Sequence, residues 1–208
     1  MYNFICVDVE TGGFDPTKNP VTEIALIVYD AMTLTELERF ETFVQNYEGL
    51  VYDDGARKAT GITDEQCASG MLRDDVVKIL IELFKKYTTK RGKQVFKPML
   101  VGHNIEDFDY GFIDTMFDYS GKNLAEYIDS HFEDTLKMAR TKWMVTDMQK
   151  FNLGACCVKA GIEHVDAHRA MSDTEVTFQL HKVFIQCLRN SGVSQIAEVK
   201  KYRETFQF

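Results

Sequence analysis

Alternating apolar and polar positions near the start of the chain predict a β-strand that carries two acids. In "FICVDVE", every second side chain shares a face, which places Asp8 and Glu10 on the same side as Phe4 and Cys6. The loop-like "TGGFDPTKNP" follows. The segments "VTEIALIVYD" and "LERFETFVQN" then predict two more strands, the first of them buried on both faces. Together the three segments predict an N-terminal antiparallel sheet.

Helical spacing of apolar residues dominates the rest of the chain. "DDVVKILIELFKKY" predicts a helix with acids near its start and lysines near its end. "PMLVGHN" suits a strand that leads into another helix. "NLGACCVKAGI" predicts a short helix from the N-cap Asn152 to Gly161, and "RAMSDTEVTFQLHKVFIQCLRNSG" predicts a long helix that ends near Gly192. The resulting order, β-β-β-α-β-α-α-α, predicts an α/β sandwich.

Composition favours one globular domain, because 208 residues with 45% hydrophobic content can bury a substantial core. We expect residues 1–192 to form this domain and residues 193–208 to be a C-terminal extension or part of the last helix. A signal peptide and a bilayer-spanning apolar stretch are both missing, which predicts a cytoplasmic (intracellular) protein with no membrane partner. The five cysteines form no C-x-x-C pair suited to zinc and are expected to be reduced.

The formal net charge of −8 argues against nucleic-acid binding through a generally basic surface. Local basic patches are still possible. The loop predicted around residues 85–97 carries six lysine and arginine residues that could follow a phosphate backbone, although solvated charge runs are commoner than binding grooves.

Asp8 and Glu10 would be costly neighbours in a dry interior, because like charges at close range resist joint ionisation unless a cation lies between them. The pair therefore suggests a divalent metal. The alternative, which is favoured for an isolated D-x-E, is that both acids lie in solvent beyond the strand end. Glu23, in the apolar "VTEIA", is interpreted as a residue beside the site or at an exposed sheet edge, and not as a ligand.

Three segments taken together resemble the DEDDh family of 3′–5′ exonucleases: "VDVETGG" at 7–13, "HNIEDFDYGFI" at 103–113 and "HRAMSD" at 168–173. Each motif alone is weak, but three motifs in the family's order and at ordinary spacing make a strong signal. Shorter similarities fill the gaps, such as "ATGIT" at 59–63 and "EDTLKMAR" at 133–140. The resemblance implies a ribonuclease H-like fold with a central mixed five-stranded sheet flanked by helices.

By this resemblance, Asp8, Glu10, an aspartate of the middle motif and Asp173 are metal ligands, and His168 is the general base. Hard oxygen ligands suit Mg²⁺ or Mn²⁺, and two such ions about 4 Å apart activate a water and stabilise the leaving 3′ oxygen. Histidine, with an unperturbed pKa of about 6.5, accepts a proton near neutral pH. Three other histidines are interpreted as surface residues: His131, His164 and His181.

The middle motif offers three acids, Glu106, Asp107 and Asp109. Counted from Asn104, the family pattern expects the aspartate four residues later, where Phe108 stands. Counted from the aromatic residues, it favours Asp109, so the motif holds one additional residue in the connection before the helix. We choose Asp109, because presenting Asp107 instead would expose Phe108 or Phe112 at roughly 1.5 to 3 kcal/mol for each apolar group. Asp107 is the alternative ligand, and Glu106 is assigned to the loop.

The resemblance also suggests substrate-binding residues. Thr11 and Gly12 match positions that approach the terminal nucleotide, where a small residue and backbone N–H groups let sugar and base come close. Phe14 could stack on a base or cap the core. His103 and Asn104 could orient the site or the substrate strand, or form a strand-end pair that bonds to the backbone.

These motifs imply an enzyme that releases nucleoside 5′-monophosphates from single-stranded or frayed 3′ ends. DNA is the preferred substrate, and an exoribonuclease that trims RNA is the alternative. A non-catalytic relative that binds nucleic acid or a polymerase is the rival from another class, but the chain keeps every expected catalytic group. A polymerase partner and a homodimer are both left open.

Overall fold

The computed structural model describes residues 2–47 and 49–206, with side chains described up to Ser191. Its centre is a mixed five-stranded sheet in the order β3-β2-β1-β6-β7, as the resemblance implied. The strands are β1 (Asn3–Thr11), β2 (Val21–Asp30), β3 (Glu36–Phe43), β6 (Met99–Gly102) and β7 (Phe132–Asp134). β1 pairs antiparallel with β2 and parallel with β6, so it is the strand at which the direction of the sheet changes.

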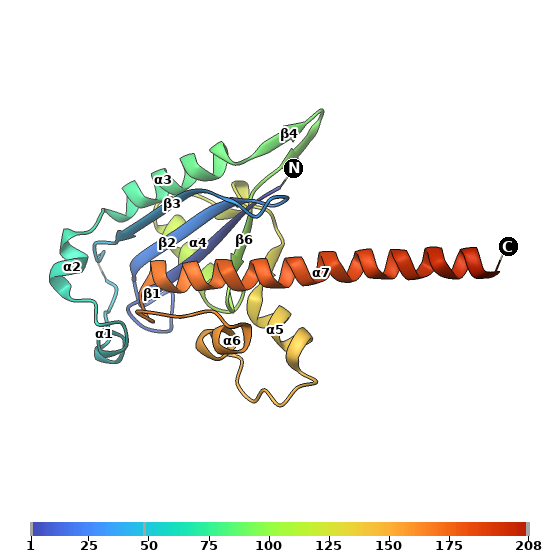
Figure 1. Cartoon of the computed structure of the whole chain (residues 1–208). Helices are drawn as coiled ribbons and strands as arrows, with labels where there is room; N and C mark the ends of the chain where they lie inside the picture. Colours follow the sequence, from blue (N-terminus) through green and yellow to red (C-terminus); the bar gives the residue numbers. More distant parts are fainter. Residues whose placement is uncertain (1, 48, 207–208) are drawn as a thin grey trace.

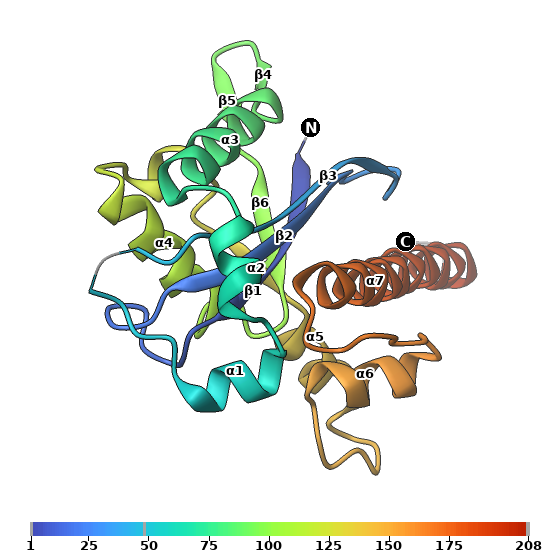
Figure 2. The ribbon, with the colours of Figure 1, turned by 90° about the vertical axis from the view of Figure 1, so that its left-hand side faces the viewer.

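Helices cover both faces of this sheet (Figures 1 and 2). On one face lie α3 (Arg73–Lys86) and α4 (Asp109–Tyr119), and on the other lies α7 (Ala170–Phe206). α5 (Thr135–Trp143) and α6 (Leu153–Ala160) pack beside α7 around Trp143 and Phe184. The shorter elements are α1 (Asp54–Thr60), α2 (Asp64–Ser69) and the 3₁₀ turn η1 (Leu124–Glu126).

Alternation along β1 produces the two-faced packing. Ile5, Val7 and Val9 enter the core shared with α3 and α4, whereas Phe4 and Cys6 enter a second core against α7. Asp8 and Glu10 follow Phe4 and Cys6 in this alternation, so they face the α7 side. β2 lies between β1 and β3 and is buried along nearly its whole length, as predicted from its continuous apolar run.

The sequence pattern also predicted the caps of α6 correctly. The Asn152 side chain accepts a hydrogen bond from the Ala155 N–H at 3.1 Å, and Gly161 ends the helix at a φ of 70°. Glycine adopts this left-handed conformation without the steric penalty that a Cβ brings.

Two predictions about the elements were wrong. α7 does not end near Gly192 but continues to Phe206 and extends well past the sheet (Figure 1), since one glycine in a long helix is tolerated. The basic segment 85–97 is not a loop but the end of α3 followed by a hairpin of β4 (Thr89–Arg91) and β5 (Gln94–Phe96). Gly92, at a φ of 61°, makes its turn.

No helix in the described part of the chain is both long and apolar enough to cross a membrane.

Candidate active site

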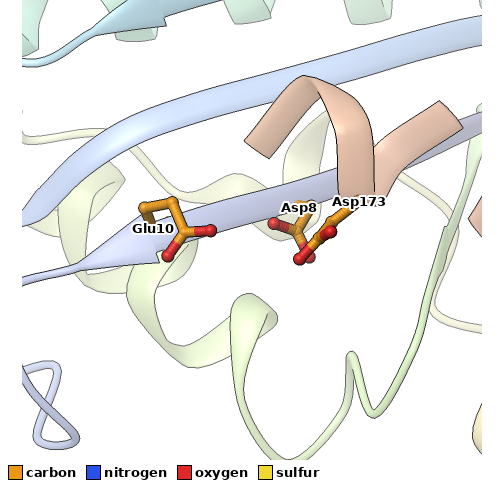
Figure 3. Close-up of side chains that lie close together, drawn as sticks. All are labelled: Asp8, Glu10 and Asp173. Atoms are coloured by element: carbon orange, nitrogen blue, oxygen red, sulfur yellow. The ribbon is translucent and has the colours of Figure 1, made fainter. Parts of the chain in front are cut away.

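Three carboxylates from two distant parts of the chain converge beside the end of β1. Asp8 and Glu10 come from β1, and Asp173 comes from the first turn of α7 (Figure 3). Each contributes an oxygen that lies within 4.8 Å of the others. They meet because α7 packs across the face of β1 that carries Asp8 and Glu10.

Burial and nearby negative charges oppose ionisation of Asp8 and Glu10. Burial is the largest cause that raises the pKa of Asp8 well above its ordinary value, followed by the nearby charges of Asp109 and Asp173. For Glu10, burial and then the charges of Asp173 and Glu23 raise the pKa from 4.5 to about 7. A bound cation removes this repulsion, and clustered carboxylate oxygens are the donors that Mg²⁺ and Mn²⁺ prefer. The residues present therefore fit a divalent metal.

Asp109 lies next to this cluster, against the backbone of β1. It is the first residue of α4, only 4% exposed, and its Oδ1 accepts a hydrogen bond from the Val9 N–H at 3.1 Å. Burial raises its pKa to about 7, against the opposing effect of the Val9 hydrogen bond. Among the described residues, the group with oxygens within 4.8 Å of one another does not include Asp109, although its charge acts on Asp8.

The other two acids of the middle motif lie outside this cluster. Asp107 is exposed, and Glu106 forms an exposed ion pair with Lys137 at 2.5 Å. Both lie in the connection before α4. The structure therefore places Asp109, and neither Asp107 nor Glu106, against the strand that carries the first two acids.

The histidines are arranged differently from the predictions. His164 Nε2 lies 2.6 Å from Asp173 Oδ1, and its side chain is only 12% exposed, so its interpretation as a surface residue was wrong. His168 is exposed and adopts a φ of 68°, and the structure does not bring it to the carboxylates. His131 is exposed, as expected.

His181 was also wrongly interpreted as a surface residue. It is fully buried, with its Nδ1 2.7 Å from the Tyr29 hydroxyl. Its spacing from Phe178 and Phe184 places it on the apolar face of α7, and this spacing is the signal that could have identified it.

Thr11 is the last residue of β1, and Gly12 and Phe14 lie in the loop that follows it, directly after Glu10. The Thr11 hydroxyl donates to the Gly13 carbonyl at 2.7 Å. Gly12 is tightly enclosed, since an added Cβ would lie 2.6 Å from Pro20 Cδ. Its N–H already donates to the Pro20 carbonyl at 2.7 Å, so that N–H is engaged within the protein. Phe14 is 91% exposed and contacts the Phe108 ring edge-on, so it does not cap the core.

His103 and Asn104 have backbone and side-chain partners within the protein. His103 Nδ1 lies 2.9 Å from Thr135 Oγ1, and its Nε2 lies 2.9 Å from the Phe151 carbonyl oxygen. Burial lowers the pKa of His103. Asn104, at a φ of 73°, donates its backbone N–H to Asp134 Oδ1. These contacts agree with the structural alternative for His103.

Asp134 was not identified from the sequence. It is 5% exposed, caps α5 by accepting from the Leu136 N–H at 2.9 Å, and also accepts from the Asn104 N–H. The aspartate before the helical segment "TLKMAR" is the capping signal that could have predicted this role.

The basic segment lies at the opposite end of the sheet from the acids. The Tyr2 ring, just before β1, contacts the Phe96 ring of the hairpin at 5.1 Å. Asp8 and Glu10 are roughly 20 and 26 Å further along the strand than Tyr2, at about 3.3 Å per residue. The hairpin therefore does not line this site.

A mixed sheet with helices on both faces and a partly buried carboxylate cluster at the end of its first strand defines the class of ribonuclease H-like nucleases. Comparison with known proteins gives the family. The exonuclease family model, of the RNase T type, matches residues 5–181. The chain therefore belongs to this exonuclease family, as a DEDDh-type 3′–5′ exonuclease domain.

Individual relatives agree with this membership. DNA polymerase III PolC-type from Bacillus cereus is 31% identical over 174 residues, which are 84% of this chain and 11% of the relative. The PolC-type polymerase of Staphylococcus aureus is 29% identical over 198 residues, which are 95% of this chain and 12% of the relative. The chain thus spans only a small part of the length of these curated relatives.

The solved structure of Escherichia coli exonuclease I in complex with a dT13 oligonucleotide has the same fold. It superposes with a TM-score of 0.73 at 22% sequence identity and covers 88% of this chain and 41% of that one.

Proposed function

We propose that this protein is a metal-dependent exonuclease that removes nucleoside 5′-monophosphates from single-stranded or frayed 3′ ends, with DNA as its preferred substrate. The observation that carries the proposal is the convergence of Asp8, Glu10 and Asp173 within 4.8 Å, in a chain of the exonuclease family. Such a cluster is costly for a protein to maintain unless it binds cations.

Asp8, Glu10, Asp109 and Asp173 are the residues that would hold two divalent ions, Mg²⁺ or Mn²⁺. When bound, such ions supply Lewis acidity to the scissile phosphate and lower the pKa of an attacking water. Asp109 also accepts a hydrogen bond from the Val9 N–H, which orients its carboxylate toward β1. The four acids come from β1, α4 and α7, so the site depends on the packing of these elements.

His168 acts as the general base and accepts a proton from the attacking water. In the present structure it lies on an exposed loop, and Asp166 and His168 both have a positive φ. This loop must therefore turn inward when substrate binds, which brings the imidazole toward the cluster. His164, already in contact with Asp173, instead orients that carboxylate.

The exposed ring of Phe14 offers a stacking surface for a base at the 3′ end. Thr11 and the tightly enclosed Gly12 shape the loop beside the terminal nucleotide. A site built in this way accepts an unpaired end more readily than a paired one. DNA is preferred because the PolC-type relatives are DNA polymerases and exonuclease I is solved with a DNA oligonucleotide. The PolC relatives also make a polymerase the favoured partner.

The test uses DNA and RNA strands of the same sequence, labelled at the 5′ end, with Mg²⁺, with Mn²⁺ or with EDTA. We expect both metals to support stepwise shortening from the 3′ end, faster for DNA, and EDTA to stop it. Faster shortening of RNA would favour the exoribonuclease alternative. Intact strands of both kinds would reject the enzymatic function and leave a nucleic-acid- or polymerase-binding role.

A further inference from the structure

Glu23 is a buried charge beside the site that the proposed mechanism does not use. It is fully buried in β2, so the alternative of an exposed sheet edge was wrong. It lies directly opposite Glu10 in the β1–β2 pairing. An unpaired carboxylate in such a position would be very unfavourable, so its partners show what it does.

Glu23 accepts three hydrogen bonds from Arg169 and Ala170 at the start of α7, and on its other side it lies beside Glu41 of β3, whose pKa is raised by burial and by the charge of Glu23. Its Oε1 accepts from Arg169 Nη2 at 2.7 Å, and its Oε2 accepts from Arg169 Nε at 3.2 Å. The same Oε2 accepts from the Ala170 N–H at 3.1 Å. A two-bond pair with the planar guanidinium fixes orientation as well as distance. Glu23 thus clamps the two residues that directly follow His168.

The other end of the His168 loop is fixed as well. The Ser172 hydroxyl donates to the Val165 carbonyl, which ties the chain to the first turn of α7. Between Val165 and Arg169 lie three exposed residues, Asp166, Ala167 and His168. The backbone at His168 can therefore move only over a short distance. The Glu23–Arg169 pair fixes the C-terminal end of the segment that moves.

We propose that Glu23, acting through Arg169, is a positioning residue that aims His168 at the carboxylate cluster. The inference rests on the proposed function, in which His168 is the general base. In this role Glu23 contacts neither the attacking water nor the substrate. It fixes the backbone next to His168, so that the imidazole can move toward the carboxylate cluster. Its loss therefore lowers the rate of hydrolysis and leaves the binding of nucleic acid intact.

The test compares the full-length protein with Glu23→Gln, which keeps an acceptor for the Ala170 N–H but loses the charge paired with Arg169. We expect kcat on a single-stranded oligonucleotide to fall by about 10- to 100-fold with KM within about twofold. Arg169→Lys keeps the positive charge but loses the planar guanidinium group. Its kcat is expected to lie between those of wild type and Glu23→Gln. It serves as a second variant because the Arg169 side chain is 41% exposed and tolerates change.

The matched control is Glu175→Gln, since Glu175 lies on α7 close to the same loop and, like Glu23, accepts from an arginine, in this case from Arg39 Nη1 at 2.6 Å. It is expected to retain the wild-type kcat. Thermal unfolding with and without Mn²⁺ provides a readout that is independent of activity. Mn²⁺ is expected to raise the Tm of Glu23→Gln as well as that of wild type, because the four carboxylate ligands are unchanged, and loss of the charge beside Glu10 alters only the size of the rise.

A double-mutant cycle with His168→Ala separates positioning from a general structural role. If Glu23 acts through His168, adding Glu23→Gln to His168→Ala lowers kcat by less than about twofold further. An undiminished additional loss would overturn the proposal, as would a Glu23→Gln enzyme as fast as the Glu175→Gln control. Failure of the proposed function is seen separately, as a wild-type protein without activity or a His168→Ala variant as fast as wild type.

Discussion

Asp107 and Asp109 are two positions apart and have opposite environments. Asp109 begins α4 and is buried against β1, whereas Asp107 is exposed in the preceding turn. The difference follows from the packing of Phe112 and Ile113 in the core, which fixes the rotation of α4. The additional residue of the motif is therefore accommodated in the connection and does not rotate the helix.

Asp109→Asn is expected to reduce kcat by about 100-fold or more, since a direct ligand should matter more than the partners of ligands, whose loss costs about 10- to 100-fold. The amide keeps the size of the carboxylate but removes its charge. Asp107→Asn is the matched control and should be as active as wild type. The measurement is the rate of 3′-end shortening at saturating Mn²⁺. Equal losses in the two variants would refute the assignment.

At the scale of elements, the helices and strands with strong apolar periodicity could be predicted from the sequence, and the short elements could not. The first two strands, α3 and the capped α6 follow directly from their apolar spacing and turn residues. β7 has only three residues, and its position at the sheet edge depends on parallel pairing with β6, which local sequence does not encode. α2 has only six residues and too short an apolar pattern to predict a helix, although the reciprocal bonds of Thr63 and Gln66 form a capping box.

The candidate site, too, could be predicted only in part. Alternation on β1 placed Asp8 and Glu10 on one face, and the structure agrees. The contacts of His164 with Asp173 and of Glu23 with Arg169 join segments through tertiary packing, and sequence spacing does not reveal such contacts. The catalytic roles of five residues stay predictions: Asp8, Glu10, Asp109, Asp173 and His168.

At the scale of the whole molecule, the buried acids make the stability of the metal-free protein depend on pH. Glu10 and Asp109 have pKa values of about 7 in the folded chain, raised from 4.5 and 3.8 chiefly by burial. Between pH 5 and 7 the folded state therefore binds more protons than the unfolded state. The free energy of unfolding must fall as the pH rises through this window.

In EDTA, we expect Tm to decrease by about 5 to 10 °C between pH 5 and pH 8. Mn²⁺ should restore much of this loss at pH 8, because the cations bind the ionised cluster of the folded state. Glu10→Gln, which removes one of the titrating acids, should flatten the decrease. Differential scanning calorimetry across the pH range makes the measurement. A Tm that does not change between pH 5 and pH 8 in EDTA would contradict the electrostatic description of the cluster.

In the proposed function, the carboxylate cluster at the end of β1 is responsible for 3′–5′ exonuclease activity. The most direct measurement compares wild type, Asp8→Asn and the exposed-acid control Asp118→Asn on a 5′-labelled single strand with Mn²⁺. Asp8 belongs to the cluster, whereas Asp118 lies on the exposed side of α4. We predict stepwise 3′ shortening by wild type and Asp118→Asn, and none by a folded Asp8→Asn. Shortening by Asp8→Asn at the wild-type rate would contradict the claim.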